Sequence, residues 1–419
     1  MFALTNLTRD YPWGSATAIA GLLGTTPSGG PEAELWMGAH PDSPSIANTP
    51  EGPVALDTLI AEHPISTLGA QAHAEFGAHL PFLVKFLAAE RALSLQVHPT
   101  KSRAKKRFAE EDAAGVPRDD AHRNYKDVNH KPEMLLALTQ FEALCGFRPC
   151  SEAAQLFRTV GMAIAATGTR VPALLDQIHR TLDSSMAAPA VVRQAFETIA
   201  GGGQGTRTLV DLAASALSAT AEAGGDLPSP LTTVIELAQQ YPGDPGVLIS
   251  LLLNRVSLAP GEAIYLPAGN IHAYLHGLGL EVMASSDNVM RGGLTGKHVD
   301  IPELLETVDF TPGEAPVVPT RVTELGQKVW EPPFAEFALQ RVEISADGAP
   351  VPLVQNGPLI VVAVSGSVLL DSPRSDMVLG RGDSVFIPAA ENPVMVHPHA
   401  NAAAETSVVF AVTCQGFNA

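Results

Sequence analysis

A pattern of glycine, proline and alternating apolar residues occurs twice in the second half of the chain. Its two copies read Gly261-x5-Pro267-x-Gly269-x2-His272 and Gly382-x5-Pro388-x-Ala390-x2-Pro393. In each copy the glycine begins a strand, and the proline then shapes a tight bend before the next strand. The repeat predicts two related β-barrels. Only the first copy ends in a histidine, so only the first barrel can hold a metal in this way.

Along the rest of the chain, the amino-acid composition and the pattern of apolar residues change twice. Residues 1 to about 145 and the chain from Leu258 onward contain short apolar runs between Pro- and Gly-rich turns, and Phe82 to Leu87 is typical of a buried strand. Between about 150 and 240 the sequence is rich in Ala and Leu, as in Ala190 to Ala200, which predicts helices. We therefore expect a mainly β chain with an α-helical insert.

The charge balance restricts the partners. The 419 residues include 26 Lys and Arg against 44 Asp and Glu, a net charge of -18. This field repels nucleic acid and anionic membranes, so we expect neither as a partner. If the substrate is itself an anion, a local group of Lys and Arg must reverse the field at the site.

Other features indicate a cytoplasmic protein. The first ten residues have no basic segment followed by an apolar one, and Val247 to Leu253 is far shorter than the roughly 20 residues of a membrane span. The three cysteines, Cys145, Cys150 and Cys414, are too few for a disulfide framework, and we expect them to be buried thiols.

Four residues could share one metal ion. Gln96 and His98 are two positions apart and project from the same face of a predicted strand. His272 closes the first copy of the repeat, and Glu133 follows Pro132, which stiffens its approach. Two imidazoles, a carboxylate and an amide oxygen suit zinc with a further position for water or substrate, although cobalt, manganese or iron also fit.

Several longer segments, which include Gln96, His98 and Glu133, resemble the type I mannose-6-phosphate isomerases (phosphomannose isomerases). The segments are Asp10–Gly14, Ala33–Pro41, Pro81–Lys85, Leu95–Pro99, Tyr125–Glu133 and Ser286–Lys297. The resemblance spans nearly the whole chain. It implies a metal-dependent aldose-ketose isomerase that interconverts D-mannose 6-phosphate and D-fructose 6-phosphate through an enediolate, with a sugar phosphate as its only expected partner and a monomer as its expected state.

The resemblance also assigns roles to residues. It implies one Zn²⁺ per chain, held by Gln96, His98, Glu133 and His272. Catalysis is expected from Arg291, Glu281 and Lys131, and substrate binding from Lys85, Ser94 and Lys297. For the proton transfer, Glu281 and zinc-bound hydroxide remain alternatives, because a buried site can poise either near neutrality.

The expected fold is two cupin-type (jelly-roll) β-barrels plus a helical domain. We expect the catalytic barrel to be built from residues 1–148 and 241–318, the helical insert from 149–240, and a C-terminal cupin-like barrel without metal from 319–419. The basic run Lys101–Arg107 is expected to be a solvated helix face, and Trp13 and Trp36 are expected to pack in the core.

Two other functions fit parts of the pattern. A cupin-type non-haem iron oxygenase also uses two His and one carboxylate, but it gives no reason for the Lys and Arg group and leaves Gln96 as a spare ligand. A non-catalytic sugar-binding bicupin fits the second copy of the repeat, but such a barrel does not require four converging ligands.

Overall fold

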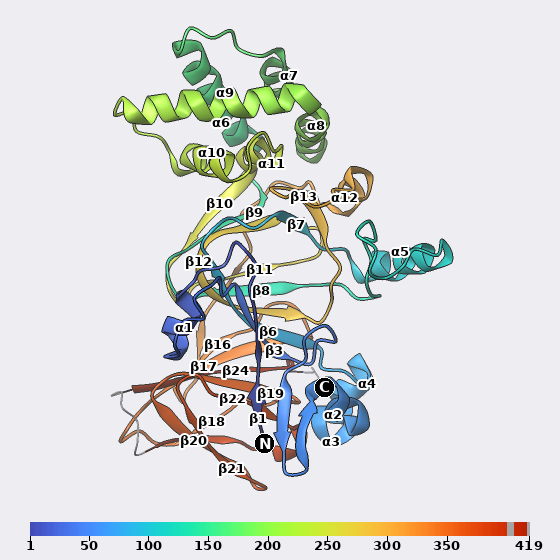
Figure 1. Cartoon of the computed structure of the whole chain (residues 1–419), viewed down its shortest axis with the longest axis vertical. Helices are drawn as coiled ribbons and strands as arrows, with labels where there is room; N and C mark the ends of the chain where they lie inside the picture. The colour runs from blue at the N-terminus through green and yellow to red at the C-terminus, as the bar shows by residue number, and fades with distance from the viewer. Residues whose placement is uncertain (400–405, 417–419) are drawn as a thin grey trace.

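The computed structural model describes residues 1–399 and 406–416. Figure 1 shows a group of helices at one end of the molecule, a large sheet assembly in the middle, and the C-terminal strands at the other end. Among the described residues the strands form sheets of 11, 9 and 4 strands. The expectation of a mainly β chain with helices is confirmed.

The 11-stranded assembly carries the predicted site. Its strands are β2 (Leu7–Arg9), β3 (Glu34–Gly38), β6 (Phe82–Ala89), β7 (Leu95–Val97), β8 (Glu133–Ala137), β9 (Phe141–Phe147), β10 (Leu253–Leu258), β11 (Ala263–Leu266), β12 (His272–Ala284), β13 (Met290–Gly293) and β14 (Val317–Val318). Every residue of β6 is buried, in agreement with the buried strand predicted at Phe82 to Leu87.

The long strand β12 joins two parts of this assembly. Its first half, from His272 to His276, pairs with β7 and β9, whereas its second half, from Gly277 to Ala284, pairs with β6 and β8. Gly277 lies between the halves with φ +126°, and a Cβ there would stand 2.7 Å from the carbonyl oxygen of Gln140. Glycine is therefore required at this point, and one strand can carry site residues from both parts.

The other two sheets contain the C-terminal strands. The 9-stranded sheet comprises β1 (Phe2–Thr5), β4 (Ile46–Thr49), β5 (Gly52–Ala55), β15 (Arg321–Val322), β16 (Lys328–Trp330), β17 (Ala338–Ser345), β19 (Leu359–Ser365), β22 (Ser384–Ile387) and β24 (Thr406–Thr413). The 4-stranded sheet comprises β18 (Val351–Pro352), β20 (Ser367–Asp371), β21 (Asp376–Gly380) and β23 (Met395–Pro398). The N-terminal strand β1 pairs with β22, so the first residues of the chain extend the C-terminal sheet.

The repeat has the same local conformation in both copies. Gly261 has φ +95° and Gly382 has φ +94°, and each precedes a four-residue strand, β11 or β22. The predicted strand after each glycine is therefore confirmed. The copies differ after the proline, because β12 begins directly at His272 whereas a short 3₁₀ helix, η2 (Ala389–Glu391), precedes β23.

The helices fall into three groups. The N-terminal ones are α1 (Ala18–Leu23), α2 (Leu56–Glu62), α3 (Pro64–Leu68) and α4 (Ala70–Phe76), and α5 (Lys101–Ala113) and α12 (Ile301–Thr307) flank the large sheet. The predicted insert, 149–240, contains α6 (Cys150–Ala166), α7 (Ala173–Leu182), α8 (Ala188–Gly201), α9 (Gly203–Glu222) and α10 (Ser229–Gln240). The helical part continues beyond the predicted end at residue 240, through α11 (Gly246–Ile249) and the 3₁₀ turn η1 (Ser250–Leu252). The helix predicted over Ala190 to Ala200 is confirmed as α8.

The insert packs tightly on the sheet. Phe147 of β9 stacks on Phe310 at a centroid distance of 5.4 Å, and the ring of Phe196 from α8 meets both. These rings belong to one hydrophobic core that runs from the helices into β7 and β9. The helices are thereby fixed to the part of the sheet that carries the predicted metal ligands.

The basic run at the start of α5 differs from expectation. Arg103 and Arg107 do not simply face solvent, because both guanidinium groups bind the buried carboxylate of Glu303 on α12, at 2.7 and 2.9 Å. The hydroxyl of Tyr125 also donates a hydrogen bond to Glu303. Two cations of the run therefore fasten α5 to α12, whereas Lys106 is exposed as predicted.

The remaining general expectations have mixed outcomes. No helix among the described residues is long and apolar enough to cross a membrane. All three cysteines are free, and Cys145 and Cys414 are buried, but Cys150 is partly exposed at the start of α6, which corrects the expectation for that thiol.

Candidate metal centre

Three of the predicted ligands meet in the interior of the large sheet assembly. The Nε2 atom of His98 lies 3.3 Å from one oxygen of the Glu133 carboxylate, and the Nε2 atom of His272 lies 3.3 Å from the other. Candidate ligand atoms of these three buried residues lie within 4.8 Å of one another. This separation allows one ion to bridge all three side chains.

Hydrogen bonds from the other ring nitrogens fix the two imidazoles. The Nδ1 atom of His98 pairs with the carbonyl oxygen of Asn288 at 2.7 Å, and that of His272 pairs with the carbonyl oxygen of Asn270 at 3.0 Å. Since a carbonyl only accepts, each Nδ1 carries a proton, and the lone pair of a neutral ring then lies on Nε2, which faces Glu133. A metal-binding imidazole has this arrangement.

The electrostatics of the cluster also suit a cation. Burial lowers the pKa of His98 to about 4, so its ring is neutral and free to coordinate. Burial works against a charged Glu133, but the ammonium of Lys131, 3.1 Å away, helps to hold the pKa of Glu133 well below its usual range. The Nε2 of His98 is buried without a hydrogen-bond partner. The residues therefore fit a bound divalent metal.

Gln96 stands in register with two other predicted site residues. Across the sheet it is paired with His272 on β12 and with Arg291 on β13. Directly opposed residues of antiparallel strands project from the same face, so the three side chains form a row. The strand pairing thus brings the expected arginine alongside the expected amide ligand.

A second group of charges lies next to the metal cluster. The Nζ of Lys85 is 3.2 Å from a carboxylate oxygen of Glu281 and 3.7 Å from one of Glu34. Burial opposes the charge of Lys85, but the two carboxylates outweigh it and raise its pKa. Burial raises the pKa of Glu281, which also accepts a 2.9 Å hydrogen bond from the hydroxyl of Tyr274.

Both groups open onto one cavity of about 350 Å³. Its lining brings together six residues that were predicted from the sequence, namely Lys85, Gln96, Lys131, Glu133, His272 and Glu281. His98 is not part of this lining and lies next to it only through its contact with Glu133. Lys85 and Lys131 place two cations inside the cavity, but Glu34, Glu133 and Glu281 line it as well, so these two lysines alone do not reverse the negative field there.

Three other predicted residues lie outside this lining. Arg291 is half-buried opposite Gln96, and Ser94 is half-buried just before β7. Lys297 is exposed in the loop after β13, and partial burial together with the charge of Arg291 lowers its pKa. Of the two cations, Arg291 is the one that strand pairing places opposite a residue of the cavity lining, Gln96.

Two of the polar residues that line the cavity, Glu34 and Tyr274, were not predicted. Glu34 accepts a 2.7 Å hydrogen bond from the indole of Trp36, and the Nζ of Lys85 lies 4.8 Å from the ring centroid of Trp36. Trp36 is buried as expected, but it also contacts the charged group. The two-residue repeat of a strand could have identified both, because residues two positions apart project from the same face. Glu34 is two positions from Trp36 on β3, and Tyr274 is two positions from His272 on β12.

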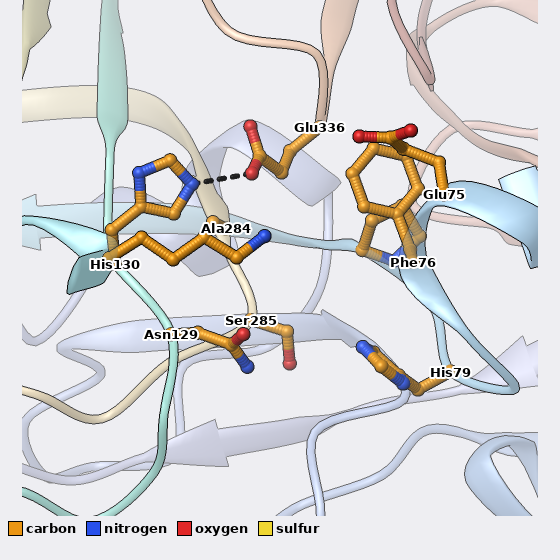
Figure 2. Close-up of a pocket in the computed structure, with 10 residues that line it drawn as sticks. Glu75, Phe76, His79, Asn129, His130, Ala284, Ser285 and Glu336 are labelled. Atoms are coloured by element: carbon orange, nitrogen blue, oxygen red, sulfur yellow. Dashed lines mark hydrogen bonds and ion pairs between the residues drawn. The ribbon is translucent and has the colours of Figure 1, made fainter. Parts of the chain in front are cut away.

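A separate cavity of about 420 Å³ lies between α4, the loop before β8 and the loop before β17. Figure 2 shows His130 and Glu336 facing each other across it, with an Nε2 to carboxylate distance of 2.6 Å. Burial favours the protonated form of Glu336, but the hydrogen bond from His130 outweighs it and lowers the pKa of Glu336. This pair links the segment before Glu133 to the C-terminal part of the chain.

The lowered pKa gives a prediction for Glu336→Gln. A carboxyl whose folded pKa lies below its unfolded value of 4.5 stabilises the protein above that pH and loses this contribution as pH falls. We expect the metal-free variant to be about 1 kcal/mol less stable than the wild type near neutral pH. Urea unfolding at neutral pH and at acid pH checks this, and an undiminished difference in acid would contradict it.

The buried His/Glu/His cluster, set among cations in a mainly β chain, defines a metalloenzyme for an anionic substrate. The first 150 residues match the model of the family described as phosphomannose isomerase type I, catalytic domain. The mannose-6-phosphate isomerase of Shigella flexneri is 39% identical over 401 residues, which cover 95% of this chain and 97% of the relative. The human enzyme of the same name is 33% identical over 94% of both chains.

Solved structures agree with the sequence relatives. The crystal structure of mannose 6-phosphate isomerase from Salmonella typhimurium, bound to its substrate fructose 6-phosphate and to zinc, matches with a TM-score of 0.85 at 35% identity, over 99% of both chains. The chain therefore belongs to the type I phosphomannose isomerase family. The family resemblance found in the sequence is confirmed.

Proposed function

We propose that this chain is a zinc-dependent isomerase that interconverts D-mannose 6-phosphate and D-fructose 6-phosphate. The observation that carries the proposal is the buried cluster of His98, Glu133 and His272, which opens onto the same cavity as Lys85 and Glu281. Membership of the family supports the substrate, and the relative with fructose 6-phosphate and zinc bound supports the metal.

Gln96, His98, Glu133 and His272 would hold one zinc ion. When bound, zinc supplies a Lewis acid that stabilises the negative charge developing on the sugar oxygens. The protein's part is to present two imidazoles and a charged carboxylate, and the carbonyl partners of His98 and His272 fix the orientation of both rings.

The proton transfer falls to groups of the chain itself. Turning the aldose into the 2-ketose moves one proton from C2 to C1 and a second from the oxygen on C2 to the oxygen on C1. Glu281 is the candidate for the transfer between the carbons, because it lines the cavity and burial raises the pKa of its carboxyl. The hydroxyl of Tyr274 and the ammonium of Lys85 contact its two oxygens and orient the carboxyl. Both contacts also limit the access of water to that proton.

The remaining cations suit the anionic part of the substrate. Lys131 lines the cavity, and its ammonium lies 3.1 Å from a carboxylate oxygen of Glu133. Arg291 has a planar guanidinium that matches a phosphate or an oxyanion in two hydrogen bonds, and Lys297 adds charge nearby. We assign substrate binding to Lys85, Ser94 and Lys297, and an additional catalytic role to Arg291 and Lys131.

The architecture allows a finer proposal. We infer that the 11-stranded assembly is a cupin-type jelly roll, because β12 spans two facing groups of strands, and that the C-terminal sheets form a second, metal-free copy. In that division the catalytic barrel is built from residues 1–148 and 241–318, the helical insert from 149–240 and the second barrel from 319–419. The strands β1, β4 and β5 come from the first range but belong to the sheet of the second barrel. We further propose a cytoplasmic monomer.

A coupled assay tests the function. We expect purified protein to form fructose 6-phosphate from mannose 6-phosphate, to lose this activity to a chelator, and to regain it with zinc. An iron oxygenase would instead consume oxygen and require iron, whereas a sugar-binding protein would bind without turnover. Turnover that survives complete removal of metal would contradict the proposal.

A further inference from the structure

Asn288 lies at the centre of a buried hydrogen-bond network behind the metal cluster. Its side chain has no exposed surface. The side-chain oxygen accepts hydrogen bonds from the backbone N–H groups of Lys126 at 2.7 Å and Asp127 at 3.2 Å. The side-chain nitrogen donates to the backbone carbonyls of Asp127 at 2.9 Å and Asn129 at 2.8 Å. The amide is therefore fully used in binding one backbone segment.

Asp127, in the segment that Asn288 binds, in turn binds residues 286–287. Its carboxylate accepts hydrogen bonds from the hydroxyl of Ser286 at 2.9 Å and from the backbone N–H of Asp287 at 2.9 Å. The backbone N–H of Asn288 in turn donates to the Ser286 hydroxyl at 3.3 Å. The two segments, 126–129 and 286–288, thus hold each other through complementary side chains, and neither position depends on regular strand pairing.

Each segment leads directly to residues of the metal cavity. Residues 126–129 lead into Lys131 and Glu133, and Arg291 follows Asn288 by three positions. The backbone carbonyl of Asn288 also accepts the hydrogen bond from Nδ1 of His98. One residue therefore connects a histidine ligand, the segment that carries the carboxylate ligand, and the strand that carries the arginine.

We propose that the side chain of Asn288 is a positioning element of the metal centre. The hydrogen bonds from the side chain to residues 126–129 fix the position of the backbone carbonyl of Asn288. This carbonyl in turn fixes the orientation and tautomer of His98. The side chain also sets the distance between His98 and Glu133 before any metal binds. The metal affinity of the site is thus determined partly by a residue that coordinates nothing. The proposal rests on the metal centre of the proposed function but requires no particular substrate.

Zinc binding by the Asn288→Ala variant tests this proposal. The variant keeps the backbone carbonyl and loses only the side-chain hydrogen bonds. We expect its zinc affinity, measured on metal-free protein by competition with a chelating dye, to fall about 10- to 100-fold. We also expect an altered visible spectrum of the cobalt-loaded protein. Both readouts are independent of isomerase activity, so they hold even if mannose 6-phosphate proves to be the wrong substrate.

The matched control is Asn6→Ala. Asn6 bonds the hydroxyls of Ser45 and Ser384, and none of these three residues lines the cavity, so its loss should lower the melting temperature and leave zinc affinity unchanged. If Asn288→Ala does not fold, Asn288→Asp replaces it, because it keeps the accepting oxygen and removes the two hydrogen bonds that the side-chain nitrogen donates to backbone carbonyls. A folded Asn288→Ala, or failing that a folded Asn288→Asp, with zinc affinity within about twofold of wild type would overturn the proposal.

Discussion

Replacement of Glu133 by alanine is expected to remove zinc and activity together. Glu133 supplies the carboxylate between the two histidines, and each of its oxygens faces one imidazole at 3.3 Å. Without it, two neutral imidazoles and an amide remain, and they supply no charge to balance a divalent ion. We expect kcat to fall at least about 1,000-fold, since Lewis-acid stabilisation is worth several kcal/mol.

The measurement combines metal analysis with the isomerase assay. Dialysed Glu133→Ala protein should contain little zinc, whereas wild type should retain about one ion per chain. The matched control is Glu142→Ala, which removes a half-buried carboxylate on β9 that binds Arg255 instead of the cavity residues. This control should keep its zinc and turnover. A Glu133→Ala protein with a full complement of zinc would mean that the carboxylate is not a ligand.

The sequence predicts this site well where local spacing carries the information. Gln96 lies on β7 and His98 directly follows the last residue of that strand, so the period of two predicts a common face for them. His272 follows from the repeat, whose glycines have nearly the same φ in both copies. The family resemblance then indicates Glu133, and the structure places its carboxylate between the two histidines. Their roles as ligands remain predictions until metal is measured.

Contacts between distant segments could not be predicted in the same way. The side chain of Asn288 binds the backbone carbonyl of Asp127, which is 161 residues earlier in the chain. Neither local sequence contains a feature that identifies the other residue as its partner. Glu34 is similar, because only the pairing of β3 with β6 places Lys85 beside it. The pairing of β1 with β22 likewise joins the two ends of the chain and crosses the domain division expected from composition.

The charge of the arginines on α5 illustrates a second limit. A basic run at helical spacing usually faces solvent, and Lys106 does so. Arg103 and Arg107 instead meet Glu303, which becomes their neighbour only because α12 packs against α5. Sequence spacing identifies which side chains share a helix face, but the partner on the facing helix depends on the tertiary fold.

Replacement of Arg291 by alanine is expected to reduce turnover while zinc remains bound. Arg291 is opposite Gln96 on the neighbouring strand but is not part of the His98, Glu133 and His272 cluster. Burial lowers the pKa of its guanidinium, which nevertheless stays charged at neutral pH. We expect kcat to fall about 100- to 1,000-fold, as for the loss of one preorganised donor to a developing oxyanion.

Two further variants separate charge, geometry and folding. Arg291→Lys keeps the positive charge but cannot form two parallel hydrogen bonds, so it should recover only part of the lost turnover. Arg255→Ala removes an arginine that binds Glu142 and Thr233 away from the cavity, and it should leave turnover unchanged. Zinc content and melting temperature are measured for all three. If Arg291→Ala turns over at the wild-type rate, the arginine serves only to hold β13, and the developing charge must be stabilised by Lys85 or Lys131 instead.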